Sequence, residues 1–374
     1  MELRYPLARP FFGSEEVREI EKVLKSGWVS QGPETEKLEN AIREYLDIEY
    51  VIAVTNCTSA LHASLLSIGI KEGDEVLVAD YTFPSTGNSV LYCRATPRFV
   101  DIKLKTCNID INSIEERITR KSKAIIPVHT FGQPVDMDGI LRIADSYNLR
   151  VIEDSACALG AKYKGKFAGT IGNIGCFSLH ARKGITTGEG GVVVTNDEEL
   201  ANKIRSLSRC GIQSAWGREK KPSPIPSFTT LSYNYKMSDI TASIGVVQLK
   251  RLDRIIKKKQ ALAKCWNENL SSIDLIELSE VIPDVEHIYQ SYICFIHPTI
   301  DRNELIRRLL KHGIQTQIGT YASHIQPIYA SRDICPNSLI AYNTALALPL
   351  YYDLTDEDIE KMCKIMAMEL REMK

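Results

Sequence analysis

One lysine could do chemistry, because it lies between an apolar segment and a glycine-rich turn. Lys183 follows the run Cys-Phe-Ser-Leu at 176–179 and precedes Gly-Ile-Thr-Thr-Gly-Glu-Gly-Gly at 184–191. A neutral lysine amine forms a Schiff base with an aldehyde, and we expect burial and the adjacent Arg182 to favour the neutral form. Ser178 is placed to hold a phosphate of the same ligand. Read alone, Lys183 could instead be a solvated surface charge, the commoner state of a lysine.

Two further segments offer groups for the same ligand. Thr58 and Ser59 follow a predicted strand and begin a predicted helix, where free backbone N–H groups and the helix dipole favour an anion such as phosphate. Asp154 ends another apolar strand, and ligands of open α/β sheets gather at the carboxyl ends of strands. A carboxylate there can pair with a protonated pyridine. The alternatives are an ordinary helix N-cap at 58–59 and an aspartate that caps a turn at 154.

These segments together describe one ligand with a phosphate, a cationic ring nitrogen and an aldehyde, which is pyridoxal phosphate (PLP). Their order, with the lysine a few tens of residues after Asp154, fits an aspartate-aminotransferase-type fold. His180 could ligate a metal, but no other His or Cys stands at ligand spacing, so we predict no metal site and a packing or substrate-facing role. Asn234 by itself is a turn former just before a helix.

The elements that must position these residues alternate between strands and helices. We predict strands at 50–54, 76–80, 98–100, 124–128, 151–154, 175–178 and 191–195, and helices at 37–46, 59–67 and 137–147. Short apolar strands separated by helices predict a mostly parallel sheet covered by helices on both faces. A long helix at 238–259 follows, with its basic residues on a solvated side. Residues 217–228 are predicted to form a mobile or partner-contacting loop.

Beyond this helix, a strand at 292–297 and helices at 303–312 and 356–368 predict a smaller α+β unit. We therefore expect two domains, a large α/β domain at 1–250 that binds PLP and a small C-terminal domain at 251–374.

Composition excludes several classes of function. The 374 residues are 44% hydrophobic and 25% charged with a formal net charge of −1, which argues against general attraction to nucleic acid or anionic membranes. No apolar stretch approaches the length of a membrane span, and the N-terminus lacks the apolar run of a signal peptide. The ten cysteines are scattered, so we expect free thiols in a reducing cytoplasm.

Over nearly its whole length the sequence resembles the DegT/DnrJ/StrS family of PLP-dependent sugar aminotransferases. Lys183 with Thr-Thr-Gly-Glu-Gly-Gly at 186–191 is the most specific element. The other matching segments, in chain order, are Gly-Trp-Val-Ser-Gln-Gly-Pro at 27–33, 56–61, Asp-Tyr-Thr-Phe-Pro-Ser-Thr at 80–86, 129–138, Glu-Asp at 153–154, Tyr-Asn-Tyr at 233–235, 319–327 and Leu-Pro-Leu at 348–350.

The resemblance implies a role for each matching position. Lys183 would carry PLP, Asp154 would bond the ring nitrogen and Phe83 would stack on the ring. Thr58, Ser59 and Ser178 would hold the phosphate, joined by Asn234 of the neighbouring subunit in a homodimer with shared sites. The sugar side would include Trp28, His180, Tyr321 and His324.

The family also implies the reaction. An amino acid, expected to be L-glutamate, would donate its amino group to a nucleotide-linked 4-keto or 3-keto 6-deoxyhexose for aminosugar and polysaccharide biosynthesis. Cys157 stands where many relatives have Gln or His near the phenolic oxygen of PLP, which leaves the tuning of the ring open. Cys57 stands where relatives often have Gly. The alternatives are transfer to a cyclitol ketone, a sugar dehydrase, in which the lysine is typically replaced by His, and a non-catalytic PLP-binding regulator.

Overall fold

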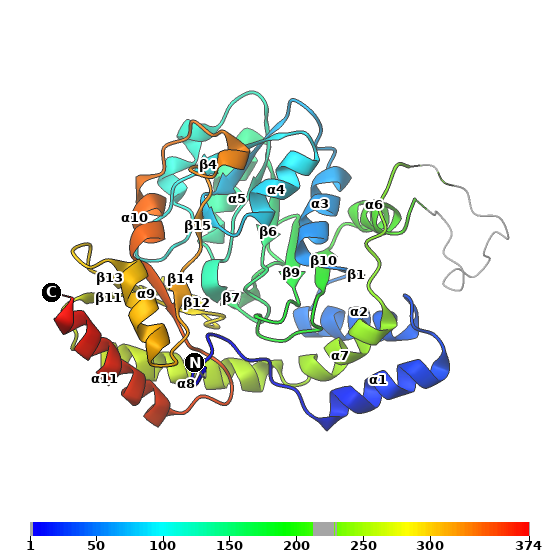
Figure 1. Ribbon diagram of the computed structural model, residues 1–374. Coiled ribbons are helices and arrows are strands. Elements are labelled where there is room, and N and C mark those ends of the chain that lie inside the picture. Colours follow the sequence, from blue (N-terminus) through cyan, green and yellow to red (C-terminus); the bar gives the residue numbers. More distant parts are fainter. Residues whose placement is uncertain (1–2, 212–227, 229, 374) are drawn as a thin grey trace.

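A seven-stranded sheet forms the centre of the protein (Figure 1). The computed structural model describes residues 3–211, 228 and 230–373. The strand order is β1-β10-β9-β6-β5-β2-β4, and only β10 runs antiparallel to its neighbours. Its strands are β1 (Tyr50–Val54), β2 (Glu75–Ala79), β4 (Thr96–Val100), β5 (Ser122–Ile126), β6 (Arg150–Asp154), β9 (Ile174–Ser178) and β10 (Gly191–Thr195). The predicted fold class, a mostly parallel sheet between helices, is confirmed.

Helices cover both faces of this sheet because successive strand residues point to opposite sides. In β10, for example, Val193 packs on the side of α3, whereas Val192 and Val194 pack on the opposite side. The first side carries α3 (Cys57–Ser67), α4 (Ser85–Tyr92) and α6 (Glu198–Ser208), and the second carries α2 (Pro33–Leu46), α5 (Met137–Tyr147) and α7 (Asp239–Leu249). Helix α1 (Ser14–Ser26) packs along α7.

A second, four-stranded sheet in the order β11-β13-β16-β14 lies in the C-terminal part of the chain. Its elements are β11 (Ile276–Leu278), β13 (Tyr292–Ile296), β14 (Gln317–Ile318) and β16 (Ala345–Leu348), with α9 (Arg302–Lys311), α10 (Pro336–Thr344) and α11 (Asp356–Glu372). Two small sheets are also present. One has the order β12 (Val285–Glu286), β7 (Lys162–Tyr163) and β8 (Lys166–Phe167), and the other pairs β15 (Tyr321–Ala322) with β3 (Tyr81–Thr82). The N-terminal segment joins this part, since Tyr5 packs in its core.

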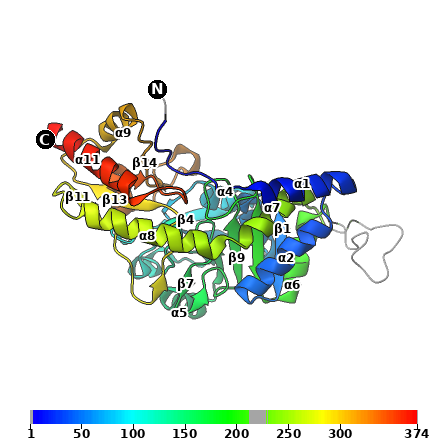
Figure 2. The ribbon, with the colours of Figure 1, turned by 90° about the horizontal axis from the view of Figure 1, so that it is seen from below.

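One predicted helix is wrong. The pattern at 238–259 forms two helices, α7 and α8 (Leu252–Leu270), because the chain turns at Lys250 and Arg251. Helix α8 runs from the core of the large sheet to that of the small sheet, as Figure 2 shows. The basic run is also not wholly solvated, because Lys259 is only 6% exposed and donates to the carbonyl of Gln290 at 3.0 Å.

The domain boundary at 250/251 stays a prediction. The loop predicted at 217–228 lies outside the described residues except for Phe228, whose side chain is exposed. Among the helices that the structure describes, none has the length and apolar character needed to cross a membrane.

Candidate active site

The N-terminus of α3 forms the anion-binding end of the candidate site. Asn56 caps this helix, its side chain accepting the N–H of Ser59 at 2.8 Å. The hydroxyl of Thr58 donates to Ser85 Oγ at 2.9 Å, and the Ser59 hydroxyl lies 3.2 Å from that of Thr55. The helix start therefore presents hydroxyls and backbone N–H groups together, as an anion site requires.

The strand register brings Ser178 to the same end of the sheet. Ser178 pairs with Gly191, and Gly191 pairs with Val54, two residues before Asn56. A Cβ atom at Gly191 would lie 2.3 Å from the carbonyl carbon of Asn56, so this position leaves no room for a side chain. The glycine at 191 thus allows the start of α3 to lie directly against β10.

Asp154 is a buried carboxylate at the end of β6. Oδ2 accepts the hydroxyl of Thr86 at 2.8 Å and Oδ1 accepts the N–H of Ala156 at 3.1 Å. Burial raises the pKa of this carboxyl, while the two hydrogen bonds and the charge of Lys183 act in the opposite direction. A cationic ligand group beside Asp154 would, like the charge of Lys183, stabilise its carboxylate.

The amine of Lys183 donates to Sγ of Cys157 at 3.1 Å, and the charges of Lys183 and Asp154 act on each other. Burial lowers the pKa of Lys183, but Cys157, Cys57 and Asp154 together outweigh burial, so the pKa lies above its ordinary value. The prediction of a neutral Lys183 amine is therefore wrong for the protein without ligand. Arg182 does not contribute, because it is exposed and donates to Gln317 at 2.9 Å.

Phe83 and Tyr321 form an aromatic corner beside these groups. Strand β15 pairs with β3, so Tyr321 lies opposite Thr82, and its ring meets that of Phe83 edge to face at 6.1 Å. The Phe83 ring is 62% exposed, which leaves an apolar surface on which a planar ligand ring could stack. His324, two residues beyond β15, bonds through Nδ1 to Asp80 at 2.7 Å.

The remaining predicted residues have weaker structural support. His180 is on the loop of Lys183, where its Nε2 lies 3.7 Å from Glu189. Trp28 packs over Gly32 and donates to the carbonyl of Gln31 at 3.4 Å. Asn234 is exposed, beside Arg209 in an isolated bridge. For these three residues a ligand role stays a prediction.

Sequence reasoning missed three residues that support the site, namely Asp80, Ser85 and Thr86. All three lie in the segment 80–86, which was noted only for its family likeness. A polar residue at the end of a predicted strand was the available signal for Asp80, as it was for Asp154.

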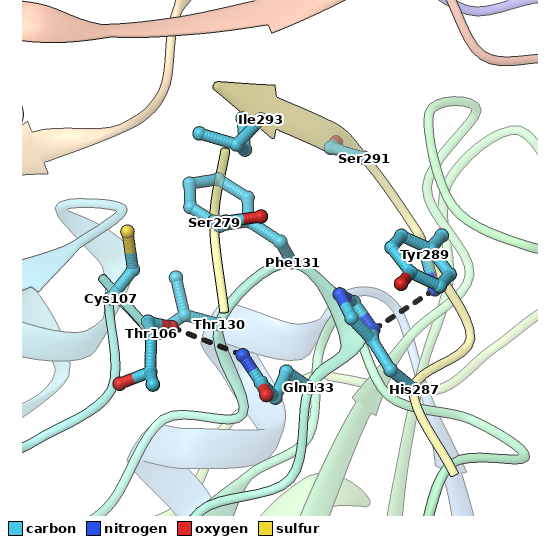
Figure 3. Close-up of a pocket in the computed structure, with 10 residues that line it drawn as sticks. All are labelled: Thr106, Cys107, Thr130, Phe131, Gln133, Ser279, His287, Tyr289, Ser291 and Ile293. Carbon is cyan, nitrogen blue, oxygen red and sulfur yellow. Dashed lines mark hydrogen bonds between the residues drawn. The ribbon is translucent and has the colours of Figure 1, made fainter. Parts of the chain in front are cut away.

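Figure 3 shows a separate small hollow between the loop at 130–133 and the segment at 287–293. Two of its polar side chains already bond to protein. Gln133 donates to the carbonyl of Thr106 at 3.3 Å, and Nδ1 of His287 accepts the N–H of Tyr289 at 3.1 Å. None of the predicted cofactor residues lines this hollow. We therefore do not assign the cofactor to it.

The residues of the candidate site fit PLP. The helix start suits a phosphate, the buried carboxylate of Asp154 suits a protonated ring nitrogen, and the Lys183 amine has only a soft sulfur as hydrogen-bond partner among the described residues. The exposed ring of Phe83 adds a stacking surface.

Comparison with known proteins decides the family. The family model described as the DegT/DnrJ/EryC1/StrS aminotransferase family matches residues 10–367. The chain belongs to this family. The aminotransferase is 36% identical over 366 residues to GDP-perosamine synthase of Escherichia coli O157:H7, covering 96% of each chain. It is also 36% identical over 367 residues to the spore coat polysaccharide biosynthesis protein SpsC of Bacillus subtilis, covering 95% of this chain and 94% of that one.

Solved structures confirm the fold and the cofactor. The PMP form of a candidate sugar aminotransferase of Streptococcus pneumoniae superposes with a TM-score of 0.92 at 27% identity, covering 99% of this chain and 100% of that chain. The same protein was solved in a PLP form, with a TM-score of 0.91. The protein is thus a PLP-dependent aminotransferase of the sugar aminotransferase family, and PLP is its cofactor.

Proposed function

We propose that the aminotransferase moves an amino group from L-glutamate to the keto group of a nucleotide-linked sugar, with Lys183 as the residue that carries PLP. One observation supports this most: the Lys183 amine bonds to Cys157, three residues after the buried carboxylate of Asp154, and an amine with a carboxylate is the pair that a PLP enzyme needs. GDP-perosamine synthase and SpsC, both 36% identical, support a sugar acceptor and a place in polysaccharide biosynthesis. The intact lysine favours amino transfer over the dehydrase alternative.

Each residue has a distinct part in this proposal. Bound PLP supplies an electron sink for the carbon that carries the nitrogen. The carboxylate of Asp154 keeps the ring nitrogen protonated, and Thr86 holds that carboxylate in place. Once it is free and neutral, the Lys183 amine would take the proton from the α-carbon of the amino acid and deliver it to the cofactor carbon that receives the nitrogen. Thr58, Ser59 and Ser178 bind the phosphate, and Phe83 holds the ring plane.

A homodimer belongs to the same proposal. Asn234 is exposed and lies in the segment just before α7, so it is available to a neighbouring subunit. Of the exposed apolar side chains, Phe83 lies just before α4 and Tyr92 ends this helix. In this arrangement Asn234 of one subunit completes the phosphate site of the other, and the enzyme acts in the cytoplasm on small-molecule substrates.

The acceptor is identified by returning the cofactor to its aldehyde form. The pyridoxamine form is prepared with glutamate and then incubated with nucleotide-linked 4-keto and 3-keto 6-deoxyhexoses, and with cyclitol ketones. We expect the aldehyde absorbance to return with a nucleotide-linked sugar. Its return only with cyclitol ketones, or a failure of glutamate to generate the pyridoxamine form, would overturn the proposal.

A further inference from the structure

Asp80 is a fully buried carboxylate at the end of β2, and both of its oxygens bond to one residue. Oδ1 accepts the backbone N–H of His324 at 2.6 Å, and Oδ2 lies 2.7 Å from Nδ1 of the same residue. The backbone carbonyl of Asp80 accepts the N–H of Ser323 at 3.0 Å. Three hydrogen bonds thus hold the segment at 323–324 against the end of β2.

This pairing leaves one ring nitrogen of His324 available. Nδ1 is engaged by Asp80, and Nε2 has no hydrogen-bond partner among the residues that the structure describes. Nε2 is not sealed inside the protein, and 11% of the His324 side chain remains exposed. A carboxylate on one nitrogen fixes the orientation of the ring and leaves the other nitrogen to a ligand.

Short contacts join His324 to the proposed cofactor wall. Strand β15 carries Tyr321, whose ring meets Phe83, and pairs with β3 at Thr82. The Thr82 hydroxyl lies 3.0 Å from that of Thr86, which donates to Asp154. The segment that holds His324 is therefore part of the same wall as the aromatic corner.

The charges around His324 favour its protonated ring. Burial lowers the pKa of His324, but the hydrogen bond and charge of Asp80 outweigh burial, so the pKa lies above its ordinary value. Burial raises the pKa of Asp80. The pKa of each partner therefore lies above its ordinary value, which favours a proton shared between Asp80 and His324. Two further carboxylates act on the ring from a distance: Asp101, bonded to Ser338, and Asp333, bonded to Arg98.

The same cluster could be considered for a metal ion, since ligand atoms of Asp80, His324 and Cys335 lie within 4.8 Å of one another. However, 2.7 Å between Nδ1 and Oδ2 is the length of a charge-assisted hydrogen bond. Sγ of Cys335 in turn donates to the carbonyl of Phe99. These atoms are thus engaged with protein, which favours a hydrogen-bonded pair.

We propose that Asp80 is a positioning residue, which holds the His324 ring so that its Nε2–H binds a hydrogen-bond-accepting oxygen of the sugar acceptor beside the cofactor. This inference rests on the proposed function. The family resemblance already implies a place for His324 on the sugar side, and the new element is that Asp80 fixes the orientation of its ring. The carboxylate of the amino acid donor is the competing ligand for the same N–H.

The first test needs no substrate. In full-length enzyme labelled with 15N-histidine, NMR titration gives the pKa and tautomer of His324, assigned by its loss in His324→Gln. We expect the pKa of His324 to fall by about one unit in Asp80→Asn, because the adjacent negative charge is removed. Asp101→Asn is the matched control, since it removes a buried carboxylate that does not touch the ring, and should change the pKa far less. An unchanged pKa in Asp80→Asn would overturn the proposal.

The second test separates the half-reactions. With glutamate, Asp80→Asn and His324→Gln should slow formation of the pyridoxamine form far less than they slow return of the aldehyde form with the sugar. With the nucleotide-linked 4-keto 6-deoxyhexose that wild type accepts, both variants should raise the KM about tenfold. Loss confined to the glutamate step, or equal loss in both steps, would contradict the proposal. If wild type accepts no sugar, the proposed function fails, while the NMR test still decides whether Asp80 controls His324.

Discussion

Nζ of Lys183 lies 3.1 Å from Sγ of Cys157, so the proposed cofactor lysine has a thiol as its hydrogen-bond partner. Burial lowers the pKa of Lys183, but this contact, together with Cys57 and Asp154, outweighs burial. The surroundings of Lys183 in the ligand-free enzyme thus favour the charged amine.

Cys157→Ala should lower the pKa of Lys183, because the partner that stabilises the ammonium is removed while burial remains. In the cofactor-free full-length enzyme, the rate of Lys183 acetylation by acetic anhydride, followed by mass spectrometry across pH, should reach its midpoint at lower pH. Cys176→Ala is the control, since that thiol is buried on β9 and bonds to Ser64. A midpoint in Cys157→Ala that stays at the wild-type value would show that the thiol does not control the lysine.

Thr86→Val should weaken PLP binding, because the carboxylate of Asp154 loses the 2.8 Å hydrogen bond that holds it. Bonds to charged groups contribute about 1.5–3 kcal/mol, so we expect the Kd for PLP to rise roughly tenfold or more. Ser89→Ala on the same helix removes a buried hydroxyl that bonds only to a backbone carbonyl of its own helix. Titration of the cofactor-free enzymes with PLP compares them, and equal affinities would refute the assigned role of Thr86.

Gly191→Ala should destabilise the fold, because the added Cβ would meet the backbone of Asn56 at 2.3 Å. Overpacking of this kind costs about 1–3 kcal/mol. The matched control is Gly184→Ala, where the nearest atom would lie at an ordinary 3.6 Å. Urea unfolding should show a lower midpoint for Gly191→Ala alone; similar midpoints would mean that α3 can move away from β10 without cost.

His287 should make the stability depend on pH. Burial lowers the pKa of this histidine to about 4, so in the folded state it stays neutral where the unfolded chain is protonated. The unfolded state then binds more protons between about pH 6.5 and 4, and the free energy of unfolding falls as the pH falls through this window. The loss should approach about 3 kcal/mol at the acidic end.

His287→Gln removes this titration, so its stability should fall less than that of wild type between pH 7 and pH 4.5 in urea unfolding. His297→Gln serves as control, since that ring lies at an exposed site and bonds to Thr299. Parallel losses of stability in all three proteins would show that His287 does not titrate as its burial requires.

Local patterns predicted the large sheet well, because its strands are short apolar runs that need no distant information. The strands at Tyr50–Val54 and Gly191–Thr195 were predicted at their observed bounds. The break between α7 and α8 was not predictable in this way. Lys250 and Arg251 continue the helical pattern, and neither position is a Pro or Gly that would mark a break. The chain turns there because α8 must reach a second core.

The site divides in the same manner. Lys183, Asp154 and the 58–59 hydroxyls follow from their positions at strand and helix ends, and the family likeness added Phe83. The Asp80–His324 pair joins residues 244 positions apart, which no local pattern reports. The direction of the Lys183 pKa shift was also out of reach, because it depends on the approach of Cys157 and Cys57 in space.

Reduction of the PLP-loaded enzyme with borohydride tests the central claim most directly, because it fixes the cofactor to the amine that carries it. Peptide mapping by mass spectrometry should find the reduced adduct on Lys183, and Lys183→Ala should lose both the adduct and glutamate-dependent amino transfer. Lys259 is the informative competitor, since it is buried and burial lowers its pKa to about 8. An adduct on Lys259, or normal conversion to the pyridoxamine form in Lys183→Ala, would contradict the account.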